Sequence, residues 1–149
     1  MRASGMLDVV EFRVLTGDVT EIVPIVNGRS LVELVTSFEQ SRHHKPAGGY
    51  AGLVPAYFRF GDLGLYYLGL EAEQWPKPGH AWLLGCDCGE VGCWPLEARI
   101  SLTDETVMWS DFSQPHRDAW NYTDFGPFRF ARDQYEAAIR DAVSTISSE

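Results

Sequence analysis

Apolar residues recur along this chain with two periods, one typical of β-strands and the other of α-helices. Segments rich in β-branched and aromatic residues, which favour strands, lie at residues 7–15, 20–26, 56–60, 64–70, 81–86, 93–102 and 106–112. Gly17-Asp18 predicts a hairpin turn between the first two of them. Because only short polar turns separate the last three, they predict an antiparallel meander over residues 81–112.

Two other segments carry apolar residues at helical spacing. Ser30 followed by Glu33 is a capping-box pattern, and the apolar positions behind it recur every three or four residues. This pattern predicts a helix over residues 30–41. A second apolar face of the same kind predicts a C-terminal helix over residues 131–146.

The order of these elements indicates the fold class. Strands come in runs rather than alternating with helices, which is typical of an α+β fold with a mostly antiparallel sheet. The expected loops, residues 42–52, 71–79 and 113–127, are short, and no internal repeat is present. We therefore expect residues 1–149 to form a single domain.

Charge and hydropathy indicate which kinds of partner and which location the protein is expected to have. The chain has 12 Lys and Arg against 21 Asp and Glu, which gives a formal net charge of -9. Such a charge repels phosphate backbones, so we expect no nucleic-acid binding, and it favours a basic protein partner. The sequence contains no run of about 18 apolar residues, so we expect no membrane span. Asp8 and Glu11 interrupt the N-terminal apolar stretch, so we expect no signal peptide and a cytoplasmic protein.

All three cysteines lie in the run C-D-C-G-E-V-G-C, at Cys86, Cys88 and Cys93. If Gly89 and Gly92 bracket a tight hairpin turn, Cys88 lies opposite Cys93 and all three thiols share one face. A structural zinc ion takes four nitrogen or sulfur ligands. Counting back from a turn at residues 103–106 places Cys93 opposite His116, so these four residues are the predicted zinc ligands.

Other states of the cysteines stay open. The thiols are alternatively buried as small apolar groups, or one pair forms a disulfide between Cys93 and either Cys86 or Cys88. A reactive or redox-sensing thiol is a further alternative. Asp87 and Glu90 argue against a nucleophile, because neighbouring carboxylates raise a thiol pKa.

A dense polar and aromatic stretch follows the meander, over residues 111–122. Asp111 with His116 suggests an acid–base pair, and Arg117 suggests an anion contact. The enzyme hypothesis therefore joins Cys93, His116 and Asp111 in one cleft. No nucleophile or cofactor motif accompanies these residues, so a structured loop or a partner-binding surface is favoured.

Several motifs together resemble a group of small uncharacterised bacterial proteins. They are the C-G-E-V-G-C turn, the W-S-D-F strand at residues 109–112, the G-P-F-x-F segment near 126–130 and the terminal Q-Y-E at 134–136. The resemblance covers roughly residues 80–140 and implies a shared α+β fold. It implies no activity and no catalytic residue.

Together these observations predict a non-catalytic binding or accessory protein whose cysteine hairpin is a structural staple. An immunity-type protein, which neutralises a basic toxin, is one member of that class. The small enzyme and the thiol redox sensor are the alternatives.

Overall fold

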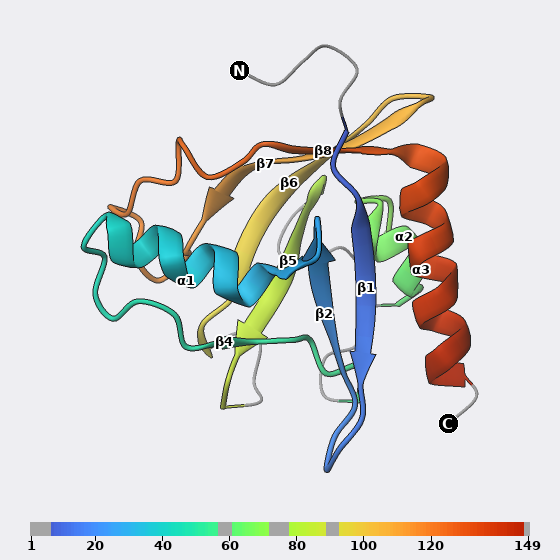
Figure 1. Ribbon diagram of the computed structural model, residues 1–149, viewed down its shortest axis with the longest axis horizontal. Coiled ribbons are helices and arrows are strands. Elements are labelled where there is room, and N and C mark those ends of the chain that lie inside the picture. Colours follow the sequence, from blue (N-terminus) through green and yellow to red (C-terminus); the bar gives the residue numbers. More distant parts are fainter. Residues whose placement is uncertain (1–6, 57–60, 72–77, 89–92, 148–149) are drawn as a thin grey trace.

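The protein folds into two antiparallel sheets and three helices, seen in a computed structural model that describes residues 7–56, 61–71, 78–88 and 93–147 (Figure 1). The strands are β1 (Val10–Leu15), β2 (Glu21–Val26), β3 (Arg29–Ser30), β4 (Tyr50–Ala51), β5 (His80–Cys86), β6 (Leu96–Leu102), β7 (Thr106–Ser113) and β8 (Phe128–Ala131). The helices are α1 (Leu31–Ser41), α2 (Leu63–Tyr67) and α3 (Arg132–Ser147). This arrangement confirms the predicted α+β class.

The two sheets have simple orders. The smaller one is β1-β2-β3 and the larger one is β4-β5-β6-β7-β8, and every ladder is antiparallel. Two isolated bridges join them, Ile22 with Leu53 and Asp8 with Phe130. The predicted strands at 7–15 and 20–26 and the meander over 81–112 are therefore confirmed as β1, β2 and β5–β7.

Both predicted helices form close to their expected limits. Ser30 caps α1, because its Oγ accepts a hydrogen bond from the backbone N–H of Val32 at 3.1 Å. Helix α3 runs from Arg132 to Ser147 and lies beside β1 on one side of the molecule, while α1 extends toward the opposite side (Figure 1).

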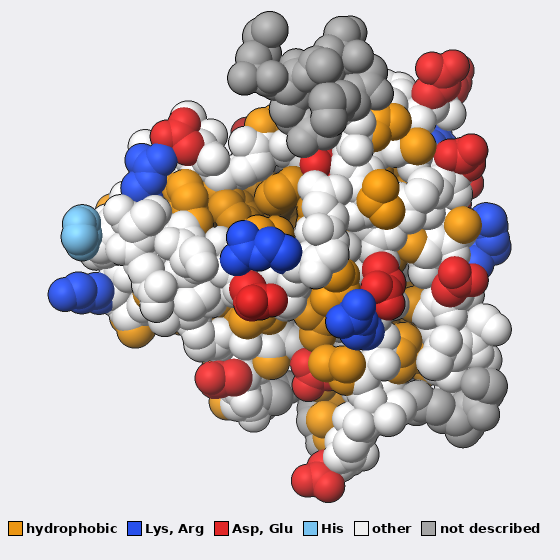
Figure 2. All heavy atoms as spheres, viewed as in Figure 1, with side chains coloured by type: hydrophobic (Ala, Val, Ile, Leu, Met, Phe, Trp, Pro, Cys, Tyr) orange, Lys and Arg blue, Asp and Glu red, His pale blue; other side chains and the backbone are white. Residues whose placement is uncertain are grey.

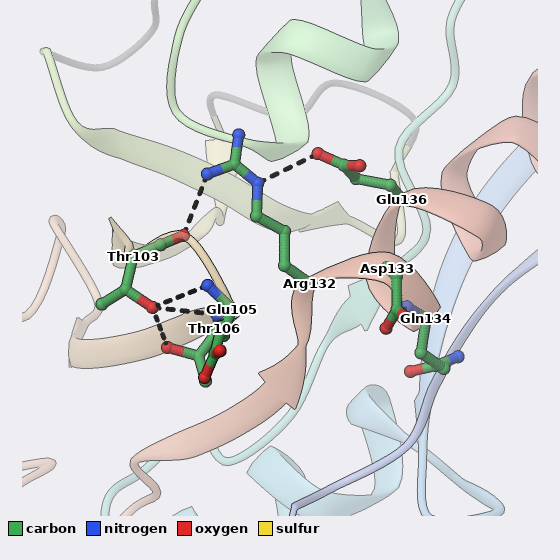
Figure 3. Close-up of polar contacts among 7 residues, drawn as sticks. All are labelled: Thr103, Glu105, Thr106, Arg132, Asp133, Gln134 and Glu136. Carbon is green, nitrogen blue, oxygen red and sulfur yellow. Dashed lines mark hydrogen bonds and ion pairs between the residues drawn. The ribbon is translucent and has the colours of Figure 1, made fainter.

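Arg132 ties the start of α3 to the turn between β6 and β7. Its Nε lies 3.0 Å from Glu136 Oε2, and its Nη1 donates to the carbonyl of Thr103 at 2.9 Å (Figure 3). The turn itself closes through the Thr103 N–H, which donates to the Thr106 carbonyl at 2.9 Å. This pairing confirms the turn that the sequence predicts at residues 103–106.

Aromatic side chains fill the core between β1, β7, β8 and α3. Trp109 and Tyr135 are fully buried, and Trp109 Nε1 donates to the Tyr135 hydroxyl at 3.0 Å. That hydroxyl donates in turn to the carbonyl of Tyr67 at 2.6 Å. Phe12 packs between these rings, 4.5 Å from the centroid of Tyr67. The Trp109 indole N–H and the Tyr135 hydroxyl are thus hydrogen-bonded within the core, whereas the buried Tyr67 hydroxyl has no hydrogen-bond partner among the described residues.

Two predictions of secondary structure are wrong in part, and one strand was not predicted. Residues 64–70 form helix α2 and its C-terminal turn rather than a strand, because the Asp62 side chain caps the N–H of Leu65 at 2.9 Å. The expected loop 42–52 contains β4, which pairs with the end of β5. Strand β8 follows the expected irregular segment 113–127. Residues 57–60 of the predicted strand 56–60 lie outside the described residues.

Cys88 and Cys93, which the sequence predicts to pair, lie outside the β5–β6 ladder. The β5–β6 ladder ends at the pair Leu84–Leu96, and Cys86 instead pairs with Tyr50 of β4. Strand β6 begins only after Pro95, which has no N–H to donate to a ladder. The intervening turn, residues 89–92, lies outside the described residues.

Candidate functional site

A buried carboxylate organises the end of the molecule where the sequence predicts chemistry. Glu39 lies on α1 and has no exposed surface. Its Oε1 accepts from the Gly48 N–H at 2.8 Å, and its Oε2 accepts from the hydroxyls of Tyr50 at 2.6 Å and Tyr122 at 2.5 Å. Gln114, which is 1% exposed, donates to the Tyr50 hydroxyl at 3.0 Å. These contacts join α1 to both of the loops around it.

The surroundings of Glu39 also keep the two tyrosines protonated. Burial is the main cause that raises the pKa of Tyr50 and of Tyr122 well above the ordinary value, and the hydrogen bond to Glu39 adds to it. Both hydroxyls therefore stay protonated at neutral pH, and each donates a hydrogen bond to the Glu39 carboxylate. A network in which each buried group has a partner is rigid, so it holds the loops in one conformation.

Gly48 and His44 connect this buried network to rings at the surface. Gly48 has a φ of +79°, which favours glycine, and its carbonyl accepts from Trp94 Nε1 at 2.8 Å. The His44 N–H donates to the Glu39 carbonyl at 2.9 Å. His44 Nε2 also lies 3.4 Å from the carbonyl of Asn121. The network thereby places the rings of Trp94 and His44.

These rings belong to a surface cluster that we call the aromatic pole, made of His44, Trp94, His116, Arg117 and Trp120. The His44 and Trp120 rings stack with centroids 4.7 Å apart and an interplanar angle of 6°. Trp94 meets Trp120 edge to face at 5.8 Å. The Arg117 guanidinium lies 5.0 Å from the Trp94 ring centroid and 6.0 Å from that of Trp120. His116 and Arg117 are exposed, and the other three are half-buried.

The register of β6 and β7 explains which residue faces His116. A one-residue shift lies between Arg99 and Glu97, and beyond it Glu97 pairs with Ser113. If this register is continued for three residues beyond the Glu97–Ser113 pair, Trp94 rather than Cys93 lies opposite His116. The Trp94 and His116 rings are stacked, with centroids 6.5 Å apart. The irregularity in the ladder thus alters the predicted neighbour of His116.

A groove of about 540 Å³ lies beside the aromatic pole. It is lined by residues of β7 and of the loop that follows, among them Asp111, Trp120 and Asn121. Asp111 has a φ of +51°, an uncommon backbone conformation for a residue other than glycine. Among the described lining residues there is no Cys93 or His116, so this groove does not collect the three residues of the enzyme hypothesis.

The cysteines lie at the end of β5 and in the segment after it. The Cys88 N–H donates to Cys86 Sγ at 3.3 Å, so these two residues are neighbours. Burial, together with the side-chain hydrogen bond to Cys88, raises the pKa of the Cys86 thiol, although the Cys88 backbone N–H acts in the opposite direction. All three cysteines are present as thiols rather than as a disulfide. A raised pKa lowers the thiolate fraction and hence the reactivity of Cys86.

The zinc hypothesis gains no support from the geometry. In the part of the chain that the structure describes, no group of three or more His, Cys, Asp or Glu side chains is arranged to hold a metal ion. Cys86, Cys88, Cys93 and His116 all belong to that part. The zinc site stays a prediction, and metal analysis of protein purified without chelator or histidine tag tests it.

Comparison with known proteins gives no further guide. Neither the family models, nor the curated proteins, nor the solved structures contain a match to this chain. Among the described residues, no helix combines the length and the apolar character that crossing a membrane requires.

Sequence patterns did not single out Glu39, although one signal for it was present, and they placed Gln114 only within the polar and aromatic stretch 111–122. Glu39 is four residues after Val35 and eight after Leu31, so it lies on the buried face of α1. A carboxylate at such a position requires buried donors. The donors come from Tyr50 and Tyr122, which are distant in the sequence, so the network itself has no local signature.

Proposed function

We propose that this chain is a non-catalytic binding protein that recognises a basic protein partner through the aromatic pole. The observation that carries the proposal is the surface cluster of two half-buried tryptophans and an exposed arginine, held by the buried network of Glu39. Tryptophan, tyrosine and arginine are the residues that most often dominate the energetics of protein interfaces.

Rigidity supports this role. Ordering of side chains at an interface costs about 0.5–1.5 kcal/mol for each one that becomes fixed. Trp94 is already held by its hydrogen bond to Gly48, and Trp120 by its stacking on His44. The aromatic pole therefore meets a partner with its main anchors in place.

The charge of the chain supports a basic partner. The net charge of -9 attracts positive proteins at long range and raises the rate of encounter. Close to the aromatic pole, Arg42 forms an ion pair with Asp124 at 2.5 Å, so these two opposite charges offset each other there. A basic toxin neutralised by an immunity-type protein is a partner of this kind.

The test compares the wild-type protein with Trp120→Ala and Arg117→Ala variants. Partners captured by chemical crosslinking are identified, purified and measured by titration calorimetry against each variant. We expect a partner of high isoelectric point, with affinity reduced about tenfold or more in both variants. Leu65→Ala is the matched control, because Leu65 is 42% exposed on α2 and is not part of the pole.

Two results would contradict the proposal. One is a purified partner whose affinity is the same for Trp120→Ala, Arg117→Ala and the control. The other is a partner that is acidic, with an association rate that does not fall as salt is added. Mass analysis after diamide treatment separates the redox alternative, since a disulfide lowers the mass by about two protons.

A further inference from the structure

Strand β1 is an edge strand of the smaller sheet, and the β1–β2 register shows which of its backbone groups face outward. The Asn27 N–H donates to the Val9 carbonyl at 2.8 Å, so residues at odd positions of β1 bond to β2. Phe12 faces Pro24, which has no N–H, and this pair fits a position without ladder hydrogen bonds. The N–H and C=O groups of even-numbered residues therefore point away from β2.

The same alternation is visible on β2. Ile22 pairs with Val14 in the register, yet its N–H and C=O bond to Leu53 on the side away from β1, at 2.8 and 3.0 Å. Val14 thus has no ladder hydrogen bond to Ile22. Three residues of β1, Val10, Phe12 and Val14, carry outward-facing backbone groups.

Gln134 of α3 occupies the first of these three positions as a neighbouring strand would. Its Oε1 accepts from the Val10 N–H at 3.2 Å, and its Nε2 donates to the Val10 carbonyl at 2.7 Å. Among the described residues, no hydrogen bond reaches the outward N–H and C=O groups of Phe12 and Val14. An edge strand with unpaired N–H and C=O groups is a template for pairing with a further strand.

These groups lie in a groove of about 500 Å³ between β1 and α3. The α3 wall is made mostly of small side chains, which include Ala137, Ala138 and Ala142. Figure 2 shows this face, with hydrophobic side chains between the two elements and charged groups beside them. Asp141 also lines the groove and has no ion-pair partner in the described part of the chain.

We propose that the groove binds an extended peptide segment, which adds to β1 as a further strand beside α3. The backbone of the peptide pairs with Phe12 and Val14, whose outward groups repeat at the two-residue spacing of a strand, about 7 Å. Every second side chain of the peptide faces the alanines of α3 and is small. A lysine or arginine of the peptide pairs with Asp141.

The wall formed by α3 favours a single segment over the edge of a second folded copy. In such a copy β1 is flanked by its own α3, so two helices would have to enter the same groove. The proposal rests on the edge of β1 alone and is independent of the aromatic pole. The two sites are therefore separated by variants of one or the other.

The experiment begins with display of random heptapeptides on phage, selected against the full chain. We expect an enriched consensus with small residues at alternate positions and a lysine or arginine. The synthetic consensus peptide should slow amide exchange of Phe12 and Val14 about tenfold or more. Ala137→Phe, which fills the groove, and Asp141→Lys should each weaken binding about tenfold or more.

Controls make the result specific. Trp120→Ala leaves the affinity within about twofold, because Trp120 belongs to the aromatic pole. Methylation of those peptide nitrogens that face β1 abolishes binding, whereas methylation of the alternate ones does not. Thermal unfolding of Ala137→Phe verifies that this half-buried position accepts the larger side chain.

Several outcomes overturn the proposal. They are the absence of an enriched peptide, exchange at Phe12 and Val14 that the peptide leaves unchanged, and binding that survives both groove variants. Loss of binding in Trp120→Ala alone assigns the peptide to the aromatic pole instead. A concentration-dependent dimer that Ala137→Phe dissociates assigns the groove to a second copy of the chain.

Discussion

Raising the pH should unfold this protein cooperatively, because its core holds protonated tyrosines. Burial raises the pKa of five tyrosines well above the ordinary value near 10, at Tyr50, Tyr66, Tyr67, Tyr122 and Tyr135. Below pH 10 both the folded and the unfolded chain keep these protons, so the free energy of unfolding does not change through them. Above it, the unfolded chain loses protons that the folded chain retains, and stability falls.

The size of this loss follows from linkage. One pH unit above the unfolded pKa, each tyrosine lowers the free energy of unfolding by about 1.4 kcal/mol. Five tyrosines together remove about 7 kcal/mol, which matches the whole stability of many domains, about 5–15 kcal/mol. We therefore expect a sharp unfolding transition between about pH 10 and pH 12.

The assay follows two signals on the same samples. Circular dichroism reports the fold, and ultraviolet absorbance reports tyrosinate. We expect the two to change together over a narrow pH range, and a return to pH 7 soon afterwards should restore the native spectrum. Gradual ionisation of most tyrosines near pH 10 with an unchanged dichroism spectrum would refute the reasoning, because it would mean that these hydroxyls are accessible in the folded protein.

Three further predictions concern single substitutions, each measured by urea unfolding with tryptophan fluorescence. Tyr122→Phe removes one hydrogen bond to the buried Glu39 carboxylate and should cost about 1.5–3 kcal/mol; a change below about 0.5 kcal/mol contradicts the network. Gly52→Ala places a Cβ 2.5 Å from the Ile22 carbonyl oxygen and should cost about 1–3 kcal/mol, whereas a neutral effect means that the backbone yields there. Asp62→Ala removes the N-cap of α2 and should cost about 1 kcal/mol, and an unchanged midpoint would remove that role.

The errors in the sequence analysis have identifiable physical causes. The stretch 64–70 is short and apolar, and such a run does not distinguish a strand from a helical turn. The distinguishing signals were Asp62 before it and Gly69 near its end, because Asp62 caps α2 and Gly69, with a φ of +74°, follows its last turn. Strand β8 has only four residues, so its alternation is too brief to recognise.

The cysteine hairpin illustrates a different limit. The sequence placed its turn close to Gly89 and Gly92, but the ladder ends earlier because Pro95 cannot donate a hydrogen bond. The predicted neighbour of His116 depended on counting along a ladder without irregularities. A single one-residue shift between Glu97 and Arg99 places Trp94, rather than Cys93, opposite His116.

Elements whose signals are local could be predicted from the amino-acid sequence. Helices α1 and α3, the β1–β2 hairpin and the β6–β7 turn follow from periodicity, capping and turn residues within a few positions of each other. The fold class followed from their order. These features need no information about which distant segments meet.

The features that support the proposed functions arise from contacts between segments that are separate in the sequence. Glu39 meets Tyr50 and Tyr122 across 11 and 83 residues of sequence, and Gln134 reaches Val10 across 124. The aromatic pole and the groove beside β1 likewise join residues from separate elements. Such contacts depend on how the sheets and helices pack against one another, and hydrophobic periodicity specifies which face of an element is buried but not which partner covers it.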